Sequence, residues 1–330
     1  MKIKLTTPSR LHFSLIDLSG DLGRVDGGIG VALNYPNVIL EASSLPNNDI
    51  IVNNGYNSEL IYDFAKTVFK HLEIDGGIDF NLLSSIPRHV GLGSKTQLSL
   101  AVAFAINYIF NKGKTVFELA KIVKRGGTSG IGVNVFQKGG FILDAGHTFG
   151  KNKQKNSFLP SRASDAPPPP ALLHYMVPEN WQFVIALPNI RDEIEGLKEI
   201  NVFQNTCPIS KEEVGAVSRL ILMVLLPGLH EKDIEVFGNG LSELQNVGFK
   251  KQEVNIQPTI IKELIQFMAD NGAYGSGISS FGCTTYGLVE GIENAKKLEQ
   301  KTKEFLNKNG GGKVFITNIN NKGMKFQILT

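Results

Sequence analysis

IPRHVGLGSKTQLSLAVAFAI, residues 86–106, joins a glycine-rich turn directly to a long apolar segment. The apolar side chains of residues 94–110 point in nearly every direction around a helical axis, which predicts a buried helix. The free N–H groups and the dipole at the start of such a helix attract anions. This turn is therefore a candidate phosphate-binding loop, with a plain strand-to-helix turn as the alternative.

Five residues at this turn suit a phosphate group. Glycines let the backbone approach a ligand closely, a serine can cap the helix, and a lysine and a threonine add a charge and a hydroxyl. These residues are Gly91, Gly93, Ser94, Lys95 and Thr96. The loop matches neither common phosphate motif, because a Walker A loop requires glycine at position 94 and GxGxxG requires glycine at position 96.

Length and composition limit the class of protein. The chain has 330 residues, which predicts two domains. Lys and Arg number 34 against 31 Asp and Glu, and the net charge of +3 indicates neither a nucleic-acid partner nor binding to an anionic membrane. Cys207 and Cys283 lack the spacing of a metal site or a disulfide framework. The longest apolar run, 220–229, contains Pro227 and is too short to span a membrane, so we expect a cytoplasmic protein.

Hydrophobic periodicity predicts a mixture of strands and helices, and hence an α+β fold. Strands are expected at 10–16, 29–42, 78–84, 131–143 and 181–187. Helices are expected at 57–71, 94–110, 115–124, 211–226, 231–245, 258–270 and 292–308. Thr115 and Glu118 have the spacing of a capping box. Near the C-terminus, KVFIT and MKFQIL flank the turn-like NNKG and predict a hairpin.

The composition changes sharply at KNKQKNSFLPSRASDAPPPP, which loses apolar periodicity and ends in four prolines. Such a segment favours polyproline II and marks a connection between domains. We therefore expect a first domain at 1–158, a connection at 159–180 and a second domain at 181–330. A connection of this kind is either a solvated linker or a lid that closes over a ligand.

The motif PxxxGLGSxT before a long apolar helix resembles the second motif of the GHMP kinase superfamily, in which the loop holds nucleotide phosphates. Five further segments resemble the β-ribofuranosylaminobenzene (hydroxybenzene) 5′-phosphate synthase family, and the resemblance extends nearly from end to end. They are TPSRLHFSLIDLSGDLGRVDGGIGVAL at 7–33, RGGTSGIGVNVFQKGGFILDAGH at 125–147, LPSRASDAPPPP at 159–170, EINVFQNTCPI at 199–209 and GAYGSGISSFGCTTYGL at 272–288.

This resemblance implies a two-domain GHMP kinase-like fold with the active site in the cleft between the domains. It implies a decarboxylating transfer that joins phosphoribosyl pyrophosphate to 4-hydroxybenzoate or 4-aminobenzoate, with Mg²⁺, in archaeal tetrahydromethanopterin biosynthesis. It also implies a homodimer. Gly132 stands roughly where many superfamily kinases carry a catalytic aspartate, and this difference agrees with a reaction other than phosphoryl transfer from ATP. An ATP-dependent small-molecule kinase and a non-catalytic phosphometabolite-binding protein remain the alternatives.

Two tasks in this reaction point to catalytic residues. Lys95 and Mg²⁺ would stabilise the negative charge that develops on departing pyrophosphate. The aromatic ring becomes nucleophilic when its para hydroxyl or amine gives a proton to a carboxylate, for which Asp17 and Asp26 are candidates. Either carboxylate could also hold the metal. Arg24 lies between them in the sequence and could pair with a benzoate or a phosphate, although all three also suit a turn with a surface ion pair.

Other polar residues are candidates for binding substrate. Two lie on one strand face, three belong to the RGGTS segment as a second anion site, and the rest belong to the connection, the EINVFQ segment and the last glycine-rich motif. They are Arg10, His12, Arg125, Thr128, Ser129, Arg162, Asn201, Gln204 and Ser276. Each also has an ordinary structural role open to it, such as a helix cap or a polar strand face. Asp144 and His147 could serve metal or base chemistry, or form a strand-end turn.

Overall fold

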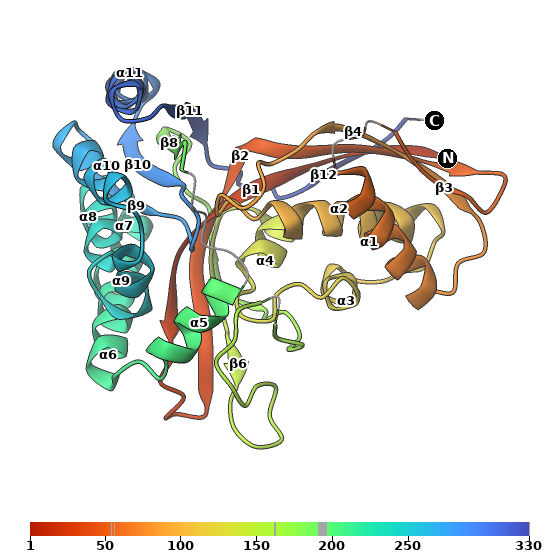
Figure 1. The fold of residues 1–330 in the computed structure, drawn as a ribbon, viewed down its shortest axis with the longest axis horizontal. Helices are drawn as coiled ribbons and strands as arrows, with labels where there is room; N and C mark the ends of the chain where they lie inside the picture. Colours follow the sequence, from red (N-terminus) through yellow and green to blue (C-terminus); the bar gives the residue numbers. More distant parts are fainter. Residues whose placement is uncertain (54, 56, 162, 191–196, 330) are drawn as a thin grey trace.

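The computed structural model describes residues 1–330 except 54, 56, 162, 191–196 and 330, and these residues form two sheets (Figure 1). The eight-stranded first sheet contains β1 (Lys2–Asp17), β2 (Arg24–Leu45), β3 (Ile50–Asn53), β4 (Gly77–Ser84), β5 (Phe141–Asp144), β6 (His147–Thr148), β7 (Ala171–Tyr175) and β12 (Lys325–Ile328). The four-stranded second sheet contains β8 (Trp181–Pro188), β9 (Gly275–Ile278), β10 (Thr285–Glu290) and β11 (Gly312–Asn318).

The main path of the first sheet runs β12-β1-β2-β4-β3, and the second sheet has the order β11-β8-β10-β9. β5 pairs with both β2 and β7, and β6 pairs with β2. β1 and β2 form a long antiparallel hairpin whose register runs from Lys2↔Ser43 to Asp17↔Asp26. In Figure 1 this hairpin bends down through the middle of the molecule, between the two groups of helices.

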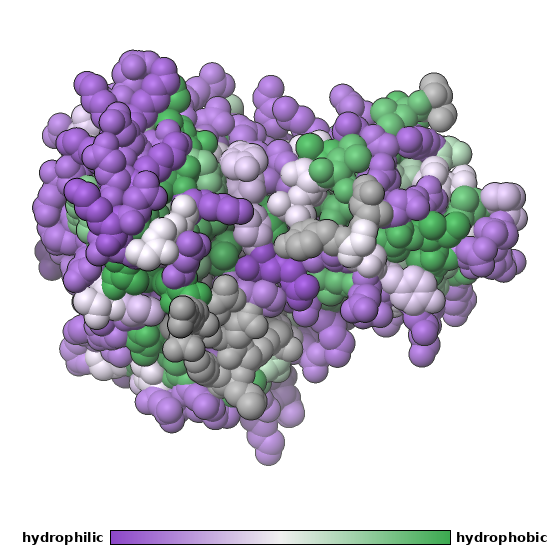
Figure 2. All heavy atoms as spheres, turned by 45° about the horizontal axis from the view of Figure 1, so that its top comes forward, coloured by the Kyte–Doolittle hydropathy of each residue, from purple (hydrophilic) through white to green (hydrophobic). Residues whose placement is uncertain are grey.

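Four helices accompany the first sheet, and α1 and α2 lie along one side of it in Figure 1. These are α1 (Ser58–His71), α2 (Ser94–Ile109), α3 (Val116–Ile122) and α4 (Ile131–Lys138). The remaining helices are α5 (Leu197–Thr206), α6 (Lys211–Leu220), α7 (Leu226–Glu231), α8 (Ile234–Leu244), α9 (Gly248–Asn255), α10 (Thr259–Asp270) and α11 (Ile292–Lys308). The outer surface at α11, at the upper left of Figure 2, is strongly hydrophilic.

An aromatic cluster joins the two sheets. The Phe13 ring of β1 lies 5.5 Å from the Tyr286 ring and 6.3 Å from the Phe183 ring, both from the second sheet. It also lies 6.5 Å from the Phe141 ring of the first sheet. All four side chains are buried, so the β1–β2 hairpin connects the hydrophobic interiors of both halves.

The buried helix and the capping box predicted from the sequence are confirmed. α2 begins directly after Gly93, and its residues 97–103 are all buried. Gly93, with a φ of +80°, takes the N-cap position expected for Ser94, because glycine adopts this left-handed conformation without strain. At α3, the Thr115 side chain accepts from the Glu118 N–H, and the Glu118 side chain accepts from the Thr115 N–H.

The strand predicted at 131–143 is wrong over most of its length. Residues 131–138 form α4, and only 141–144 form a strand. Ile131 and Val135, one helical turn apart, pack with Ala32 and Ile142 in a small buried cluster. The β-branched composition of this segment favours a strand, but burial of one helical stripe against β2 and β5 decides the outcome.

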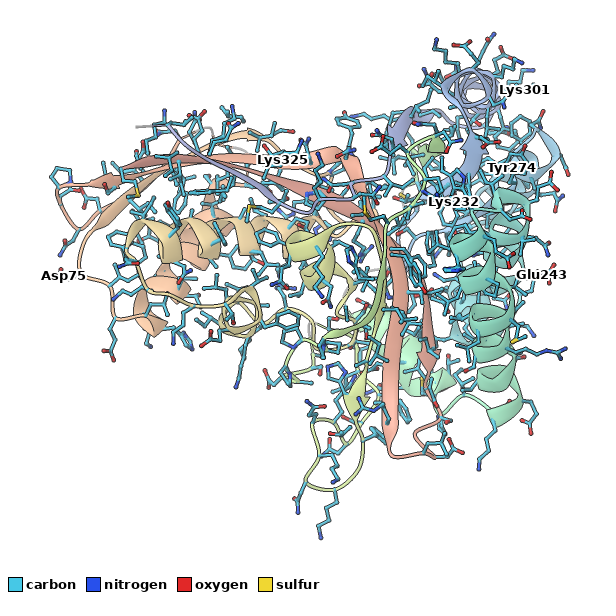
Figure 3. All side chains as sticks on the ribbon, turned by 180° about the vertical axis from the view of Figure 1, so that it is seen from behind. Asp75, Lys232, Glu243, Tyr274, Lys301 and Lys325 are labelled. Carbon is cyan, nitrogen blue, oxygen red and sulfur yellow. The ribbon has the colours of Figure 1, made fainter. Side chains whose placement is uncertain are left out.

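The predicted C-terminal hairpin is also wrong. β11 pairs with β8 of the second sheet, whereas β12 pairs with β1 of the first sheet. The link between them is held on the first half of the molecule, because Asn320 exchanges backbone hydrogen bonds with Ala32 and Gly140. Seen from behind in Figure 3, β12 with Lys325 lies along the first sheet, far from Lys301 on α11.

One long helical stretch continues through Pro227. The stretch consists of α6, a π-helical segment at Ile221–Leu225 and α7, which follow without a break. The N–H group that Pro227 lacks is tolerated next to the π-helical segment, because the hydrogen bonds there are already shifted from the i→i+4 pattern of an α-helix to i→i+5. By length and composition, Lys211–Glu231 resembles a membrane span. Its Val217, Ile221 and Leu225 belong to the protein core. α5 and α9 are two helices that the sequence patterns did not predict.

Candidate active site

A cavity of about 290 Å³ lies between the turn before α2 and the turn that joins β9 to β10. All five residues of the predicted phosphate loop line this cavity, namely Gly91, Gly93, Ser94, Lys95 and Thr96. Arg10 of β1, Arg125 after α3 and Glu199 of α5 line it as well. The fold thus brings polar and charged residues from segments that are far apart in the sequence to one cavity beside the start of α2.

Glycine is required at two positions of the loop. Gly91 has a φ of +89°, and a Cβ there would lie 2.2 Å from the Ser279 carbonyl oxygen. Gly93 has a φ of +80°, and its Cβ would lie 3.0 Å from Cγ of Arg10. The loop is tied to the second sheet, because Ser279 Oγ donates to the Gly91 carbonyl at 2.7 Å and the Thr284 N–H donates to the Val90 carbonyl at 3.1 Å.

Two partly buried arginines, Arg10 and Arg125, give the cavity a positive charge. Arg10 donates to the Gly91 carbonyl, and burial lowers its pKa to about 10 against the opposing charges of Glu253 and Glu199. Burial likewise lowers the pKa of Arg125 to about 10. Nε of Arg125 is buried and has no hydrogen-bond partner in the part of the chain that the structure describes. Because buried charges are normally paired, this guanidinium indicates an anionic ligand.

A buried ion pair lies behind Arg10. Lys250 and Glu253 of α9 contact each other and are almost completely buried. Burial lowers the pKa of Lys250 and raises that of Glu253, while their mutual attraction opposes both shifts. Both groups also interact with Arg10, because the charge of Glu253 raises the pKa of Arg10 and the charge of Arg10 lowers the pKa of Lys250.

His12, Ser129 and Asp144 form a second buried arrangement. His12 Nε2 lies 3.1 Å from Ser129 Oγ, and Ser129 Oγ donates to Asp144 Oδ2 at 3.3 Å. Asp144 also accepts the Gly130 N–H at 2.8 Å and the Gly146 N–H at 2.9 Å. Burial raises the pKa of Asp144 to about 7, and burial with the charges of nearby basic groups lowers the pKa of His12.

Asp26 belongs to a different buried cluster. Its Oδ2 lies 2.6 Å from His147 Nδ1, and Lys155 Nζ donates to both of its oxygens at 2.9 and 3.1 Å. His147 Nε2 donates to the Pro167 carbonyl at 2.8 Å, and Thr128 Oγ1 donates to the Leu159 carbonyl. These contacts fasten the connection to the β1–β2 hairpin.

Several other predicted site residues lie away from the cavity lining. Asp17 accepts from the Ser19 N–H and hydroxyl, and Arg24 donates to the Ala145 carbonyl from an exposed position. Ser276 donates to the Ile265 carbonyl within the second half of the molecule. On α5, both Asn201 and Gln204 are exposed. Arg162 lies outside the described residues.

The sequence patterns missed some residues that the fold places at the cavity. Arg88 and His89 line it and directly precede the glycine-rich turn, so their proximity to that motif was the available signal. Glu199 and Ser280 also line it. Both lie in segments that carry the family resemblance, 199–209 and 272–288, and that was the available signal. The structure leaves Ser276 outside the lining and instead uses Ser279 and Ser280, a few residues later in the same motif.

Comparisons with known proteins agree with this geometry. Residues 59–139 match the GHMP kinases N terminal domain, and residues 225–308 match the GHMP kinases C terminal model. The structure resembles homoserine kinase from Cytophaga hutchinsonii, with a TM-score of 0.69 and 18% identity over 99% of this chain and 97% of that one. It also resembles L. major mevalonate kinase, with a TM-score of 0.71 and 12% identity over 97% and 96%. These likenesses confirm the predicted α+β, GHMP kinase-like fold.

Two archaeal relatives match over nearly their whole length. Beta-ribofuranosylphenol 5′-phosphate synthase from Methanothermobacter thermautotrophicus is 40% identical, and the match covers 98% of each chain. The protein of the same name from Methanocaldococcus jannaschii is 39% identical over 97% of this chain and 99% of its own. By these matches the chain belongs to the β-ribofuranosylphenol 5′-phosphate synthase family.

Proposed function

We propose that this protein is a decarboxylating phosphoribosyltransferase. It condenses phosphoribosyl pyrophosphate with 4-hydroxybenzoate or 4-aminobenzoate to a β-ribofuranosyl-benzene 5′-phosphate and releases pyrophosphate and carbon dioxide. Membership of the synthase family supports this reaction. The observation in the molecule that supports it is the pair of partly buried arginines, Arg10 and Arg125, in one cavity with the glycine-rich loop.

The cavity suits a substrate with phosphate groups at two ends. The start of α2 and Lys95 would receive the pyrophosphate, because helix N–H groups and an ammonium stabilise the negative charge that grows as the bond to ribose C1 breaks. Arg125 would receive the 5′-phosphate, since a guanidinium binds phosphate oxygens in a fixed bidentate geometry. Ser161 of the connection also lines the cavity and could close over the bound substrate.

We further propose that Mg²⁺ binds together with the substrate. Within the described residues, no group of three or more His, Cys, Asp or Glu side chains is suited to a metal. Among the described residues that line the cavity, Glu199 provides a carboxylate. Mg²⁺ commonly takes one or two carboxylates plus substrate phosphates, so this donor set fits an ion that is shared with pyrophosphate. When bound, the ion supplies positive charge for the leaving group, and Glu199 would hold it from the protein side.

The test is an incubation of the purified protein with phosphoribosyl pyrophosphate, Mg²⁺ and either benzoate. We expect pyrophosphate and carbon dioxide in equal amounts, and the faster acceptor identifies the physiological one. A parallel incubation replaces phosphoribosyl pyrophosphate with ATP and a panel of small alcohols. Consumption of ATP without carbon dioxide release would contradict the transferase and favour a kinase.

Two further expectations accompany this proposal. The family resemblance supports a homodimer, which sedimentation velocity of the purified protein tests. The same resemblance supports a role in tetrahydromethanopterin biosynthesis in the archaeal cytoplasm. Depletion of the protein in its host should then lower the amount of that cofactor and raise the level of the unused benzoate.

A further inference from the structure

The hydrogen bonds of His12, Ser129 and Asp144 have a direction that follows from their donors and acceptors. Asp144 Oδ2 already accepts the Gly130 N–H, and the Ser129 hydroxyl donates its single proton to the same carboxylate. Ser129 Oγ can therefore only accept from His12 Nε2, 3.1 Å away. The arrangement fixes His12 as the tautomer with a proton on Nε2 and a lone pair on Nδ1.

That lone pair has no protein partner. His12 is only 5% exposed, and its Nδ1 has no hydrogen-bond partner anywhere in the described part of the chain. Buried polar atoms are nearly always hydrogen-bonded, so this nitrogen is suited to a donor that a ligand brings. A lone pair can accept a hydrogen bond or a proton, but it cannot bind an anion.

His12 lies beside the cavity. Its N–H donates to Ser279 Oγ at 3.0 Å, and its carbonyl accepts the Ser280 N–H at 3.2 Å. Ser280 lines the cavity, and so does Arg10, which precedes His12 by two residues on β1. Alternate residues of a strand project to the same face, so the side chains of Arg10 and His12 share a face.

We propose that His12 Nδ1 accepts the proton of the para hydroxyl or amine of the aromatic acceptor, and that Asp144, through Ser129, positions His12 for this role. The inference rests on the proposed phosphoribosyl transfer and names the group that activates its acceptor. The two carboxylates expected for this task have other partners in the structure. Asp17 is bonded to Ser19, and Asp26 is held between His147 and Lys155.

The proton and electrons balance within this step. The O–H bond of 4-hydroxybenzoate breaks, its proton goes to His12 Nδ1 and its electron pair moves into the ring. The ring carbon that bears the carboxylate bonds to ribose C1 while the bond from C1 to pyrophosphate breaks. Loss of carbon dioxide returns the electrons of the broken C–C bond to the ring, and the imidazolium returns its proton to the phenolate. His12 is thereby regenerated without another reactant.

Local packing holds this arrangement tightly. A Cβ at Gly28 would lie 3.0 Å from Ser129 Oγ, 3.1 Å from Asp144 Oδ2 and 3.3 Å from His12 Nε2. The three polar atoms therefore converge on the bare backbone of β2. A side chain larger than that of glycine would push these three atoms apart, so the hydrogen bonds depend on glycine at position 28.

The surrounding charges agree with the proposed role. Arg10 and Lys250 face His12 and, with burial, lower its pKa, so the imidazole is neutral and its lone pair available. The phosphates of bound substrate would offset the charge of Arg10 and ease proton uptake. Burial raises the pKa of Asp144 to about 7, with Asp26 adding to the rise and His147 opposing it. Once Asp144 is protonated, its carboxyl group no longer requires the hydrogen bond from the Ser129 hydroxyl. Ser129 can then donate to His12 Nε2, so His12 is no longer held in one tautomer as the pH falls below about 7.

The first test reads the tautomer in the ligand-free protein by ¹⁵N NMR of histidine side chains. At a pH well above 7, where Asp144 is ionised, we expect wild-type His12 to carry its proton on Nε2 alone. Ser129→Ala should give a mixture of both tautomers, and Ser129→Thr, which keeps the hydroxyl, should restore the wild-type pattern. His71, exposed on α1, provides an internal reference that should not change. An unaltered His12 signal in folded Ser129→Ala would overturn the positioning role.

The second test is kinetic. General-base assistance is worth roughly 10²–10⁴-fold, so His12→Gln should lower kcat by about 10²-fold or more, and Ser129→Ala by about tenfold or more. KM for phosphoribosyl pyrophosphate should change less than about threefold in both. Because Ser129 acts only through His12, the double variant should be no slower than His12→Gln alone. Additive losses would contradict the proposal.

The pH profile and a control complete the design. Wild-type kcat should fall as the pH decreases below about 7, and Asp144→Asn should lose this dependence. Asp270→Asn removes an exposed carboxylate of α10 and should leave kcat and the His12 signals unchanged. If the wild-type protein releases no pyrophosphate with either benzoate, the proposed function fails. If it does so but full kcat survives in His12→Gln, only this inference is overturned.

Discussion

Two polar regions of the molecule, the cluster around Asp26 and the surroundings of the cavity, differ in how completely their buried atoms are paired. In the cluster of Asp26, His147 and Lys155, both carboxylate oxygens and both ring nitrogens have partners within the protein. At the cavity, by contrast, Nε of Arg125 and Nδ1 of His12 have none among the described residues. The first cluster is paired within the protein, whereas we assign the two unpaired nitrogens at the cavity to bound substrate. Burial of charge alone therefore does not mark a functional site, and an unpaired buried atom is a reason to look for a ligand.

The largest expected effect is a loss of stability on disrupting the cluster of Asp26, His147 and Lys155. Lys155→Ala leaves Asp26 with His147 as its remaining partner in a fully buried position. Removing one member of a buried ion pair typically costs about 3–5 kcal/mol, so we expect a loss of that size in the free energy of unfolding. Urea denaturation measures it. A loss below about 1 kcal/mol would mean that the connection is not fastened by this cluster.

The next effect is a loss of activity on replacing Arg125, which lines the cavity. Arg125→Met keeps much of the volume of the side chain but removes a partly buried guanidinium whose Nε has no hydrogen-bond partner among the described residues. We expect unchanged or higher stability together with a loss of about 10²–10³-fold in kcat/KM, comparable to removal of a charge-stabilising donor. The contrast with Lys155→Ala is the test. A variant that loses stability and keeps activity would mean that Arg125 stabilises the fold and does not bind substrate.

A smaller effect follows from the pKa of Asp144, about 7 in the folded protein. Because this value is raised above that of the unfolded chain, the folded state takes up the proton first, and stability is lost as the pH rises through the folded pKa. Asp144→Asn does not titrate. As the pH is lowered from about 7 to about 5, wild type should therefore gain about 2 kcal/mol relative to the variant. Urea denaturation of both proteins at several pH values measures this gain, and parallel curves would contradict it.

The smallest effect sharpens the assignment of the phosphate loop. Lys95→Ala removes one cation from a site that also has helix N–H groups and three arginines. We expect a loss of about tenfold in kcat/KM for phosphoribosyl pyrophosphate, with unchanged stability. Steady-state kinetics with pyrophosphate detection measures the loss. Unchanged kcat and KM would remove Lys95 from the pyrophosphate site.

The sequence predicted those features that depend on neighbouring residues. α2, the capping box at Thr115 and the phosphate loop were all readable because each is set within a few residues. The predicted C-terminal hairpin is wrong because β11 and β12 pair with strands of different sheets, and no local sequence pattern specifies a distant partner. The same limit applies to the site. Asp26 and Asp144 look alike in the sequence, and only the fold shows that one is matched by cations and the other by a serine.

The pairing of β12 with β1 has a consequence for how the chain is made. Residues 3–6 meet residues 325–328, so β1 keeps an open edge on the ribosome until residues 325–328 have been translated. Contacts of such sequence separation are formed late because loop closure must come first. An uncovered strand edge is a surface for pairing with other nascent chains. The nascent protein is therefore exposed to aggregation at this edge until residues 325–328 pair with β1 and cover it.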